Sequence, residues 1–389
     1  MKKIFTSVFI LLFLWMNSQN ITFEDPSFKW LLVFSADAAK DLNGNFFKID
    51  TNNDGEISLS EASFVSCIDV HLGGITSLEG IRNFTNLSEL FVTTGASEGI
   101  PTIDLHQMPS LKYFSYGGNT LQSLNMQGNT GLLELEIQDT FHLTGIDLSS
   151  CIELQKVKFS RTTITSLNLK NLIALKEVNC SENYNLSSVQ LSGSTNLENL
   201  EISNSILTDI DLTGLSKLNT VKLSINNFTT LNLQDQNQLT FLNVWQNFDL
   251  TSLYIKNGAN EVVNFQDTPN LQYICSDANQ ITDLLSTIGT DYGGNPSTVV
   301  DASCGAVLNS SENNLGKAVI IYPNPVIDVL GIMTKNKIQS VEIFDSAGRL
   351  VFSTISPKDT INISHLKSGV YLVSIKSENK KRNKQIIKK

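Results

Sequence analysis

An apolar-x-apolar triplet recurs through the middle of the chain at steps of 21 or 22 residues. The triplets are Ile103–Leu105, Leu124–Met126, Ile146–Leu148, Leu167–Leu169, Val189–Leu191, Ile210–Leu212, Leu231–Leu233 and Leu253–Ile255. A constant period in this range is typical of a solenoid, because one coil is too short to bury its own apolar face and must stack on its neighbours. The period therefore predicts a stack of parallel coils, and it makes binding the expected function.

A second pattern, L-x-x-φ-x-φ-x-x-N with φ apolar, runs in phase with the first. One coil shows it in full at Leu175, Val178, Cys180 and Asn183. This half of each coil resembles the leucine-rich repeat, where φ-x-φ is a short parallel strand and the Asn side chain satisfies backbone groups at the turn. Thr140, Thr162 and Ser205 replace the Asn in three coils, so we expect a ladder of Asn side chains with gaps.

The first 18 residues carry Lys2 and Lys3, followed by an apolar run from Ile4 to Met16. This pattern predicts a signal peptide at residues 1–18. The alternative is a membrane anchor, but the run is shorter than the roughly 20 residues that a spanning helix needs. We see no second segment that could span a membrane, and we expect none in the mature form.

Charge divides the chain into two parts. Residues 317–389 hold 13 Lys and Arg against 5 Asp and Glu, whereas the whole chain has a net charge of −10. A basic end on an acidic body suggests separate roles for the two parts. The acidic repeats argue against nucleic acid as a partner.

The segment DTNNDGEISLSE at Asp50–Glu61 matches the EF-hand loop D-x-[DN]-x-[DN]-G-x₅-E. Ca²⁺ prefers six to eight oxygen ligands, and this spacing supplies them from alternate positions. The expected ligands are Asp50, Asn52, Asp54, Glu56 through its carbonyl, Ser58 and Glu61. The alternative is an Asx-rich turn without an ion. We expect a structural calcium site beside the first coil.

The chain has five cysteines and no CxxC pair, which disfavours zinc. Cys180 occupies a φ position and is expected to be a small core residue. Cys275 and Cys304 bracket the end of the repeats, next to a predicted amphipathic helix at 280–289. In an exported protein we expect these two residues to form a disulfide.

Three stretches near the N-terminus, DPSFKWLL, KIDTNNDGEISLSEA and GGITSLEGIRNFTNLSEL, resemble the opening of exported leucine-rich-repeat proteins of Bacteroidetes, especially flavobacteria. LKEVNCSEN and SLYIKNGANEVVNFQDTPNLQYICSD, with the later Cys304, resemble their repeats and C-terminal cap. YPNPVIDVL, VEIFDSAGRLV, INISHLKSGVYLVSI and KQIIKK resemble the type A sorting domain of the type IX secretion system. The resemblance implies export through that machinery to the cell surface or the medium.

The expected organisation has five parts. They are a signal peptide at 1–18, an N-terminal helical cap with the EF-hand-like loop at 19–72, a leucine-rich-repeat solenoid at 73–279, a C-terminal cap and linker at 280–316, and a sorting domain folded as a small antiparallel β-sandwich at 317–389. The repeats are then the only part left to carry a function other than routing.

Strand positions that point away from the core form one continuous outward face. The candidate ligand residues on it are Tyr113, Glu134, Glu136, Lys156, Lys158, Glu177, Glu201, Lys222, Phe241 and Trp245. Phe241 and Trp245 are interpreted either as a ligand anchor or as packing against the cap or an adjacent loop. Glu134 and Glu136 could mimic a catalytic carboxylate pair, but Lys156 and Lys158 one coil on favour an ion-pair ladder.

No catalytic motif appears in the sequence, and the four histidines are scattered, so we expect no enzyme. The favoured function is a secreted or cell-surface binding protein of adhesin type for an extracellular protein or glycan. The alternative is a structural or assembly component of the cell envelope without a dedicated ligand.

Overall fold

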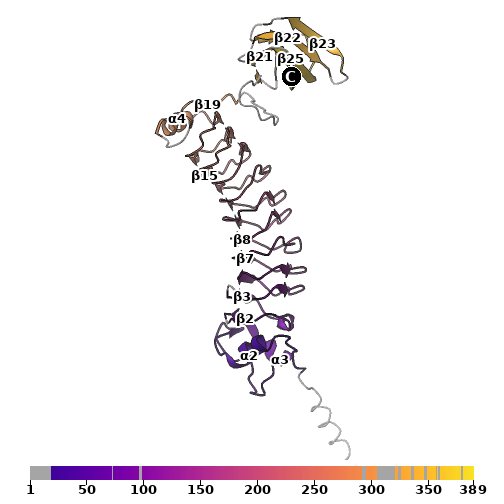
Figure 1. Ribbon diagram of the computed structural model, residues 1–389, viewed down its shortest axis with the longest axis vertical. Coiled ribbons are helices and arrows are strands. Elements are labelled where there is room, and N and C mark those ends of the chain that lie inside the picture. Colours follow the sequence, from indigo (N-terminus) through magenta and orange to yellow (C-terminus); the bar gives the residue numbers. More distant parts are fainter. Residues whose placement is uncertain are drawn as a thin grey trace, which may run out of the picture. The chain divides into compact units, whose positions relative to one another are not determined.

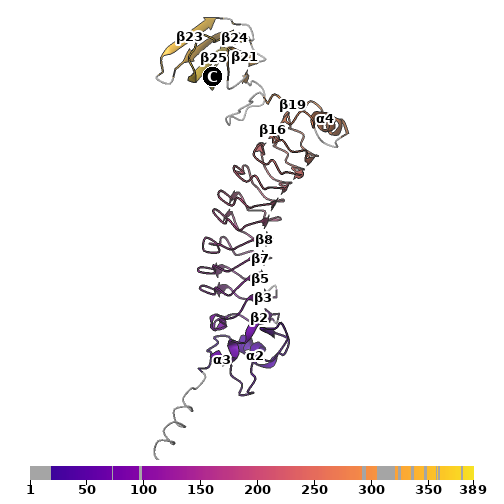
Figure 2. The ribbon, with the colours of Figure 1, turned by 180° about the vertical axis from the view of Figure 1, so that it is seen from behind.

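The computed structural model describes residues 19–71, 73–95, 99–290, 295–304, 320–322, 326–333, 337–345, 348–355, 357, 360–377 and 380–389. Contacts divide the chain into two compact units, Met1–Ala302 and Ser303–Lys389. The predicted signal peptide at 1–18 lies outside the described residues. The first unit is a β-solenoid (Figures 1 and 2), which confirms the fold class expected from the repeat.

One wall of the solenoid is an 11-stranded sheet that contains the φ-x-φ segments. Its strands, in spatial order, are β1 (Ala39–Asp41), β2 (Val65–Val70), β3 (Glu89–Thr93), β5 (Tyr113–Gly117), β7 (Glu134–Gln138), β8 (Lys156–Ser160), β10 (Glu177–Asn179), β12 (Asn199–Glu201), β13 (Thr220–Lys222), β15 (Phe241–Asn243) and β17 (Val262–Asn264). From β2 onward all pairs are parallel and in register, as in the pairing of Val178 with Val157 and Leu200. Each coil therefore adds one rung to the sheet.

The opposite wall contains the first set of triplets, but it is interrupted. Its strands are β4 (Thr102–Asp104) and β6 (Ser123–Asn125), then β9 (Ser166–Asn168) and β11 (Ser188–Gln190), then β14 (Thr230–Asn232), β16 (Ser252–Tyr254), β18 (Tyr273–Cys275) and β19 (Val299–Asp301). The triplets Ile146–Leu148 and Ile210–Leu212 form no strand, and Ile146 and Ile210 are only partly buried. The opposite wall is thus broken at two coils.

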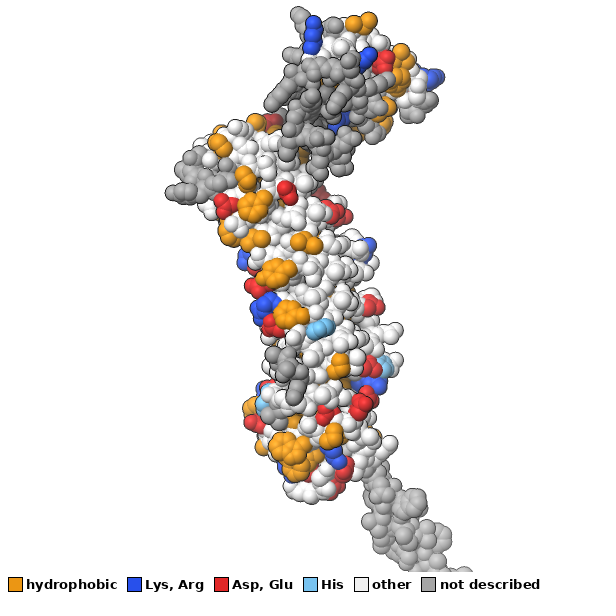
Figure 3. Space-filling model, in the orientation of Figure 1, with side chains coloured by type: hydrophobic (Ala, Val, Ile, Leu, Met, Phe, Trp, Pro, Cys, Tyr) orange, Lys and Arg blue, Asp and Glu red, His pale blue; other side chains and the backbone are white. Residues whose placement is uncertain are grey.

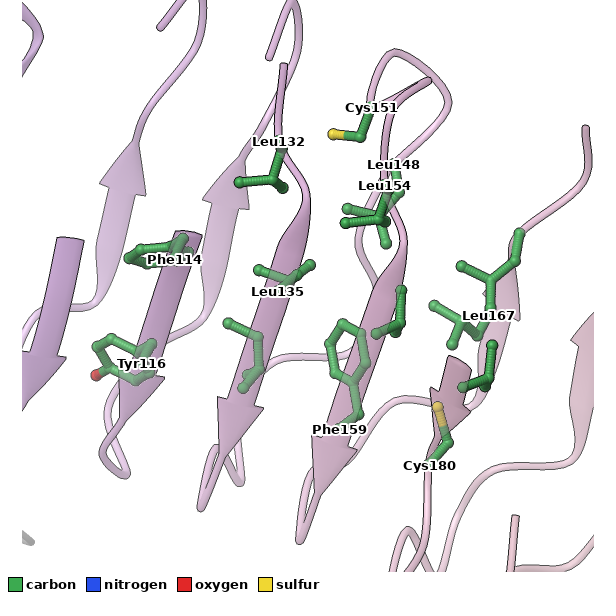
Figure 4. Packing of buried hydrophobic residues seen from close by; sticks show 14 of the residues in the cluster. Phe114, Tyr116, Leu132, Leu135, Leu148, Cys151, Leu154, Phe159, Leu167 and Cys180 are labelled. Atoms are coloured by element: carbon green, nitrogen blue, oxygen red, sulfur yellow. The ribbon is translucent and has the colours of Figure 1, made fainter. Parts of the chain in front are cut away.

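Both walls point apolar side chains into one continuous core. Phe114, Leu135 and Phe159 project inward from neighbouring strands of the large sheet, and Leu148 and Leu167 face them from the other wall (Figure 4). Cys180 lies in the same core and is fully buried. The inward positions of the two sequence patterns therefore coincide with the core of the solenoid.

The predicted Asn ladder is present where the sequence provides Asn. Asn183 Nδ2 donates to the Phe159 carbonyl one coil back at 2.9 Å and to the Cys180 carbonyl in its own coil at 2.8 Å. Asn226 and Asn247 make equivalent pairs of bonds. At two of the gaps, the buried hydroxyls of Thr140 and Ser205 have no hydrogen-bond partner.

A second series of polar side chains, which the sequence analysis did not interpret, supports the opposite wall. The middle residue of six triplets accepts a hydrogen bond at Oδ1 from the backbone N–H two residues later, at 2.9–3.2 Å. These residues are Asp104, Asn125, Asp147, Asn168, Asp211 and Asn232. Such Asx turns explain why Asp and Asn dominate the middle position, since each one fixes the turn that leaves this wall.

The N-terminal cap contains helices α2 (Pro26–Phe34) and α3 (Leu59–Ala62), and the 3₁₀ helix η1 (Ile81–Asn83) follows in the first coil. Pro26 begins α2, and Asp25 is its N-cap. The predicted helical cap at 19–72 also contains two strands that were not predicted, β1 and β2. Strand β2 pairs in parallel with β3, and β1 covers it in antiparallel fashion. The large sheet thus begins inside the cap.

At the other end, helix α4 (Ile281–Thr290) confirms the predicted amphipathic helix. Leu284 is buried, whereas the adjacent Leu285 is 49% exposed. The segment read as cap and linker also holds β19, which pairs in parallel with β18 and so adds one more rung to the opposite wall. Cys275 and Cys304 are each disulfide-bonded, while Cys67, Cys151 and Cys180 are free.

The second unit is a small antiparallel β structure, as predicted for the C-terminal domain. One sheet has β20 (Ile320–Tyr322), β21 (Val329–Met333) and β24 (Thr360–Asn362); the other has β22 (Ile338–Phe344), β23 (Leu350–Ile355), β25 (Gly369–Ser377) and β26 (Lys380–Lys388). Its core includes Leu330, Val341, Val373 and Ile386, all fully buried. This unit therefore has a hydrophobic core of its own.

Candidate binding face and calcium loop

The outward side of the large sheet carries a ladder of opposite charges. The ion pairs between neighbouring coils on this side include Glu134–Lys156 at 3.5 Å, Glu136–Lys158 at 2.6 Å, Asp139–Arg161 at 2.6 Å, Arg161–Glu182 at 3.5 Å and Glu201–Lys222 at 3.0 Å. The pairing of Glu134 and Glu136 with the lysines one coil on confirms the predicted ladder. Exposed pairs of this kind contribute little stability each, but they neutralise the centre of the face.

Aromatic side chains lie toward both ends of this face. The rings of Phe91 and Tyr113 are in contact, with centroids 4.9 Å apart and an interplanar angle of 37°, and the Tyr113 hydroxyl donates to Glu136 Oε2 at 3.2 Å. Burial raises the pKa of Tyr113, with the Glu136 charge adding to the rise, so the phenol stays neutral. Phe91 was not among the outward positions predicted from the sequence, although the alternation of Leu90 and Val92 in β3 places it on this face.

At the C-terminal end, Phe241 and Trp245 are both half-buried. The Trp245 indole Nε1 donates to Asp267 Oδ2 at 3.1 Å in the next coil. Phe241 lies beside the exposed Val262 in the sheet register. Glu177 is exposed on the same face. The predicted ligand residues thus share one face, with the two C-terminal aromatics partly embedded in it.

The EF-hand-like loop is ordered by a chain of backbone-to-carboxylate bonds. Asp50 accepts from the N–H groups of Asp54 and Gly55 at 3.2 Å, Asn52 Oδ1 accepts from Asp54 N at 2.9 Å, and Asp54 Oδ1 accepts from Glu56 N at 2.8 Å. Gly55 has φ +81°, a left-handed conformation that favours glycine. The loop therefore turns in the manner that its sequence pattern predicts.

Glu61, at position twelve of the loop, has its own set of partners. Its Oε2 accepts from the backbone and hydroxyl of Ser58 at 3.0 and 2.8 Å, forming a capping box on α3, and its Oε1 accepts from Thr51 N at 2.9 Å. Burial raises the pKa of this carboxyl, but the bonds from Ser58 and Thr51 outweigh that effect and hold the pKa below its usual value. Glu61 is thus an anion at neutral pH.

The loop has the all-oxygen donor set that Ca²⁺ prefers. Across the described ranges, however, no three His, Cys, Asp or Glu side chains are gathered so that they could hold a metal ion. Lys48 Nζ lies 3.4 Å from Asp50 Oδ2, and Lys29 pairs with Glu56. The donor chemistry therefore fits calcium, while the carboxylates are engaged with backbone and lysine groups.

A hollow of about 280 Å³ lies on the opposite wall between two adjacent coils. It is lined by Asp209, Ile210, Asp211, Leu212, Thr213, Asn232, Asp235 and Gln236. Asp211 Oδ1 accepts the Asx-turn hydrogen bond from the Thr213 N–H, and hydrogen bonds from Thr213 hold the pKa of Asp211 below its usual value.

Residues 320–389 match the family described as "Secretion system C-terminal sorting domain". The match lies within the predicted 317–389. It indicates that the chain is exported to the cell surface or outside by the type IX secretion machinery. Within the described part of the chain, no helix has both the length and the apolar character needed to cross a bilayer. No curated protein matches the chain.

Among solved structures, the chain is similar to InlP of Listeria monocytogenes, at 14% identity over 93% of this chain and 98% of that chain, with a TM-score of 0.35. The functional domain of InlJ from the same organism, which includes a cysteine ladder, is 14% identical. The match covers 96% of this chain and 100% of that chain, with a TM-score of 0.25. The leucine-rich-repeat domain of APL1B is 15% identical over 64% of this chain and 91% of that chain, with a TM-score of 0.34. The parallel strands described above establish the repeat architecture independently of these likenesses.

Proposed function

We propose that the chain is an exported leucine-rich-repeat binding protein whose large sheet engages an extracellular protein or glycan through its outward face. One observation carries this proposal: inward strand positions are uniformly apolar, whereas the outward positions change from coil to coil and end in aromatic clusters at both ends. A solenoid needs only its inward positions for folding. The outward ones are free to encode a partner, and half-buried aromatics are the side chains that most often dominate such contacts.

The test is a glycan array and a cell-surface pull-down with the mature chain, from residue 19 onward. A Phe241→Ala/Trp245→Ala variant should lose the captured partner while its melting temperature stays near that of the parent chain. A Ser123→Ala/Ser166→Ala variant alters exposed positions on the opposite wall, so it should still capture the partner. Equal capture by the aromatic variant and the parent chain would reject this face.

A specific observation favours the alternative of a structural envelope component. The charges at the centre of the sheet face are already paired between coils, so the face offers little free charge to steer a ligand. If the parent chain captures nothing from the array or the cell surface in calcium-containing buffer, the structural role is the better one. We propose no catalytic activity.

We also propose that Asp50, Asn52, Asp54, Glu56, Ser58 and Glu61 bind one Ca²⁺ with a structural role in the N-terminal cap. The complete loop pattern and the ordered Asx turns support this assignment. Binding to the folded state alone raises the melting temperature with ligand concentration. Calcium should therefore raise the melting temperature relative to chelator.

The calcium test compares two variants by calorimetric titration. Asp54 is exposed and does not belong to the α3 capping box, so Asp54→Ala should abolish the calcium heat without unfolding the cap. Glu79→Ala, an exposed acidic position in the first coil, should bind like the parent chain. Absence of any calcium heat in the parent chain, with a melting temperature unmoved by chelator, would refute the site.

A further inference from the structure

The position directly after the Asn-ladder residue forms a row along one edge of the solenoid, which we term the turn ridge. In six consecutive coils it is occupied by Phe141, Thr163, Tyr184, Ile206, Asn227 and Phe248. The four apolar or aromatic members are all exposed: Tyr184 by 63%, Phe248 by 53%, Phe141 by 50% and Ile206 by 42%. Hydrophobic side chains stand at intervals along the solenoid among polar surface in Figure 3.

The backbone holds the ridge residues at a fixed spacing. Two positions earlier in each turn is a non-glycine residue in the left-handed region, such as Glu182 with φ 61° and Gln246 with φ 55°. The intervening ladder residue, Asn183 or Asn247, is bonded to the coil before it. Because the coils are consecutive strands of one sheet, neighbouring ridge positions are about 4.8 Å apart. Phe141 and Tyr184 are therefore separated by two coil spacings, and Tyr184 and Phe248 are separated by three.

Folding does not account for these exposed side chains. Single exposed apolar residues are ordinary on protein surfaces, but here they recur at one structural position in four of six coils. Beside Tyr184 and Phe248 the ladder residues Asn183 and Asn247 already bond the turn, and beside Phe141 and Ile206 the ladder position is Thr140 or Ser205. The ridge also has no charged member, in contrast to the ion-paired face of the large sheet. The charged side chains two positions before three of the ridge residues, Asp139, Arg161 and Glu182, are paired with one another, so the ridge suits an uncharged ligand.

We propose that the turn ridge binds a neutral, linear polysaccharide. Sugar rings would stack on Phe141, Tyr184 and Phe248, while the polar positions Thr163 and Asn227 between them would bond ring hydroxyls. A polymer of pyranose rings repeats along its length at a spacing close to that of the coils, so successive rings meet successive ridge positions. This surface is separate from the sheet face of the proposed function, so the two proposals can fail independently.

A second copy of the chain is the less suitable occupant. A stable protein interface buries about 800 Å² on each partner, around a compact apolar centre. The ridge is one residue wide, and its apolar members are interrupted by Thr163 and Asn227. It offers a line of contacts and not a patch, which suits a narrow polymer.

The experiment is affinity electrophoresis of the mature chain in gels containing neutral glucans, mannans or xylans, with anionic alginate as the charged comparison. The parent chain should be retarded by at least one neutral polymer and not by alginate. Retardation should persist when salt is raised, because screening weakens charge interactions and leaves stacking intact. A Phe141→Ala/Tyr184→Ala/Phe248→Ala variant should bind at least about tenfold more weakly.

Two controls make the result specific. Ile152 and Ile173 are 55% and 61% exposed but lie in the turns that precede β8 and β10, away from the ridge positions, so Ile152→Ala/Ile173→Ala should bind like the parent chain. Tyr184→Phe should also bind like it, since the ring face is kept. The ridge assignment is overturned if no neutral polymer retards the parent chain or if the triple variant binds equally well. It is also overturned if the Phe241→Ala/Trp245→Ala variant alone loses binding, or if the triple variant changes only self-association in sedimentation.

Discussion

Asp25 and Thr76, 51 residues apart, are joined by a hydrogen bond of 2.8 Å from the Thr76 hydroxyl to Asp25 Oδ2. The other carboxylate oxygen of Asp25 accepts from the backbone N–H groups of Ser27 and Phe28 at 2.7 and 3.1 Å, which caps helix α2. One side chain, only 5% exposed, therefore fixes the start of the helix and attaches it to the first coil. The cap and the solenoid are held together at this point.

Replacing Asp25 should destabilise the cap. Asp25→Ala removes an N-cap and leaves donors of Thr76 without their acceptor, which should lower the free energy of unfolding by about 1 to 3 kcal/mol. Glu24→Ala is the matched control, because Glu24 is exposed and its bond from Ser77 is at the surface. Urea unfolding of both variants measures the difference. Equal stability of the two variants would contradict the role given to Asp25.

Lowering the pH should reduce the stability that the Asp25 carboxylate contributes. Burial raises the pKa of Asp25, but the hydrogen bonds from Thr76, Phe28 and Ser27 outweigh it, so the folded pKa lies below the ordinary value. A depressed folded pKa contributes stability that is present above the unfolded pKa of about 3.9 and lost as pH falls through the folded pKa. The stability gap between the parent chain and Asp25→Ala should therefore narrow below about pH 4. A gap that stays constant down to pH 2 would contradict this linkage.

The Asn ladder provides a sharp stability test. Asn226 Nδ2 donates to the carbonyls of Ile202, Leu223 and Ser224, and the side chain is 3% exposed. Asn226→Ala leaves these buried carbonyls without that donor and should cost about 2 to 4 kcal/mol. Asn227→Ala, at the exposed neighbouring position, should cost less than about 0.5 kcal/mol. Similar melting temperatures for the two variants would show that the ladder contributes little.

The periodic positions of the sequence predicted the solenoid well, because burial on two walls restricts them to apolar residues. Val178 and Leu200 could be placed in register from spacing alone. The Glu136–Lys158 pair also followed from spacing, since equivalent positions of successive coils become neighbours. In a repeat protein, residues one period apart in the sequence therefore lie side by side in neighbouring coils.

Features set by single coils were harder to predict. Strand β2 was not predicted, although Val65, Ile68 and Val70 lie 22 residues before Leu87, Leu90 and Val92 and repeat their spacing. The breaks in the opposite wall at Ile146 and Ile210 are not evident from the apolar triplets. The partners of Glu61 depend on how α3 is capped, which the loop pattern does not specify. The exposure of Tyr184 follows from the direction of its turn, and a leucine-rich pattern constrains that position only weakly.

Thiol reactivity should separate the cysteines into two groups. Burial raises the pKa of Cys180 to about 12 and those of Cys67 and Cys151 to about 11, so these thiols should resist alkylation at pH 8 until the chain is unfolded. We predict that Cys275 and Cys304 are linked to each other. Non-reducing peptide mapping after alkylation tests both statements. Modification of Cys180 in the folded chain, or a free thiol at Cys275, would contradict them.

Removing the C-terminal domain should change where the protein goes without changing how the repeats fold. Residues 320–389 match a sorting domain, and their unit has its own buried core around Val341 and Val373. Deletion of 317–389 should therefore leave the melting transition of the solenoid in place while the chain accumulates in the periplasm of a host that has type IX secretion. Fractionation with an antibody to the repeats measures the distribution, and the chain with Lys388→Ala/Lys389→Ala shows how far the basic end alone matters. Secretion of the truncated chain at the parent level would contradict the assignment, whereas loss of the solenoid's melting transition would show that the two units depend on each other for stability.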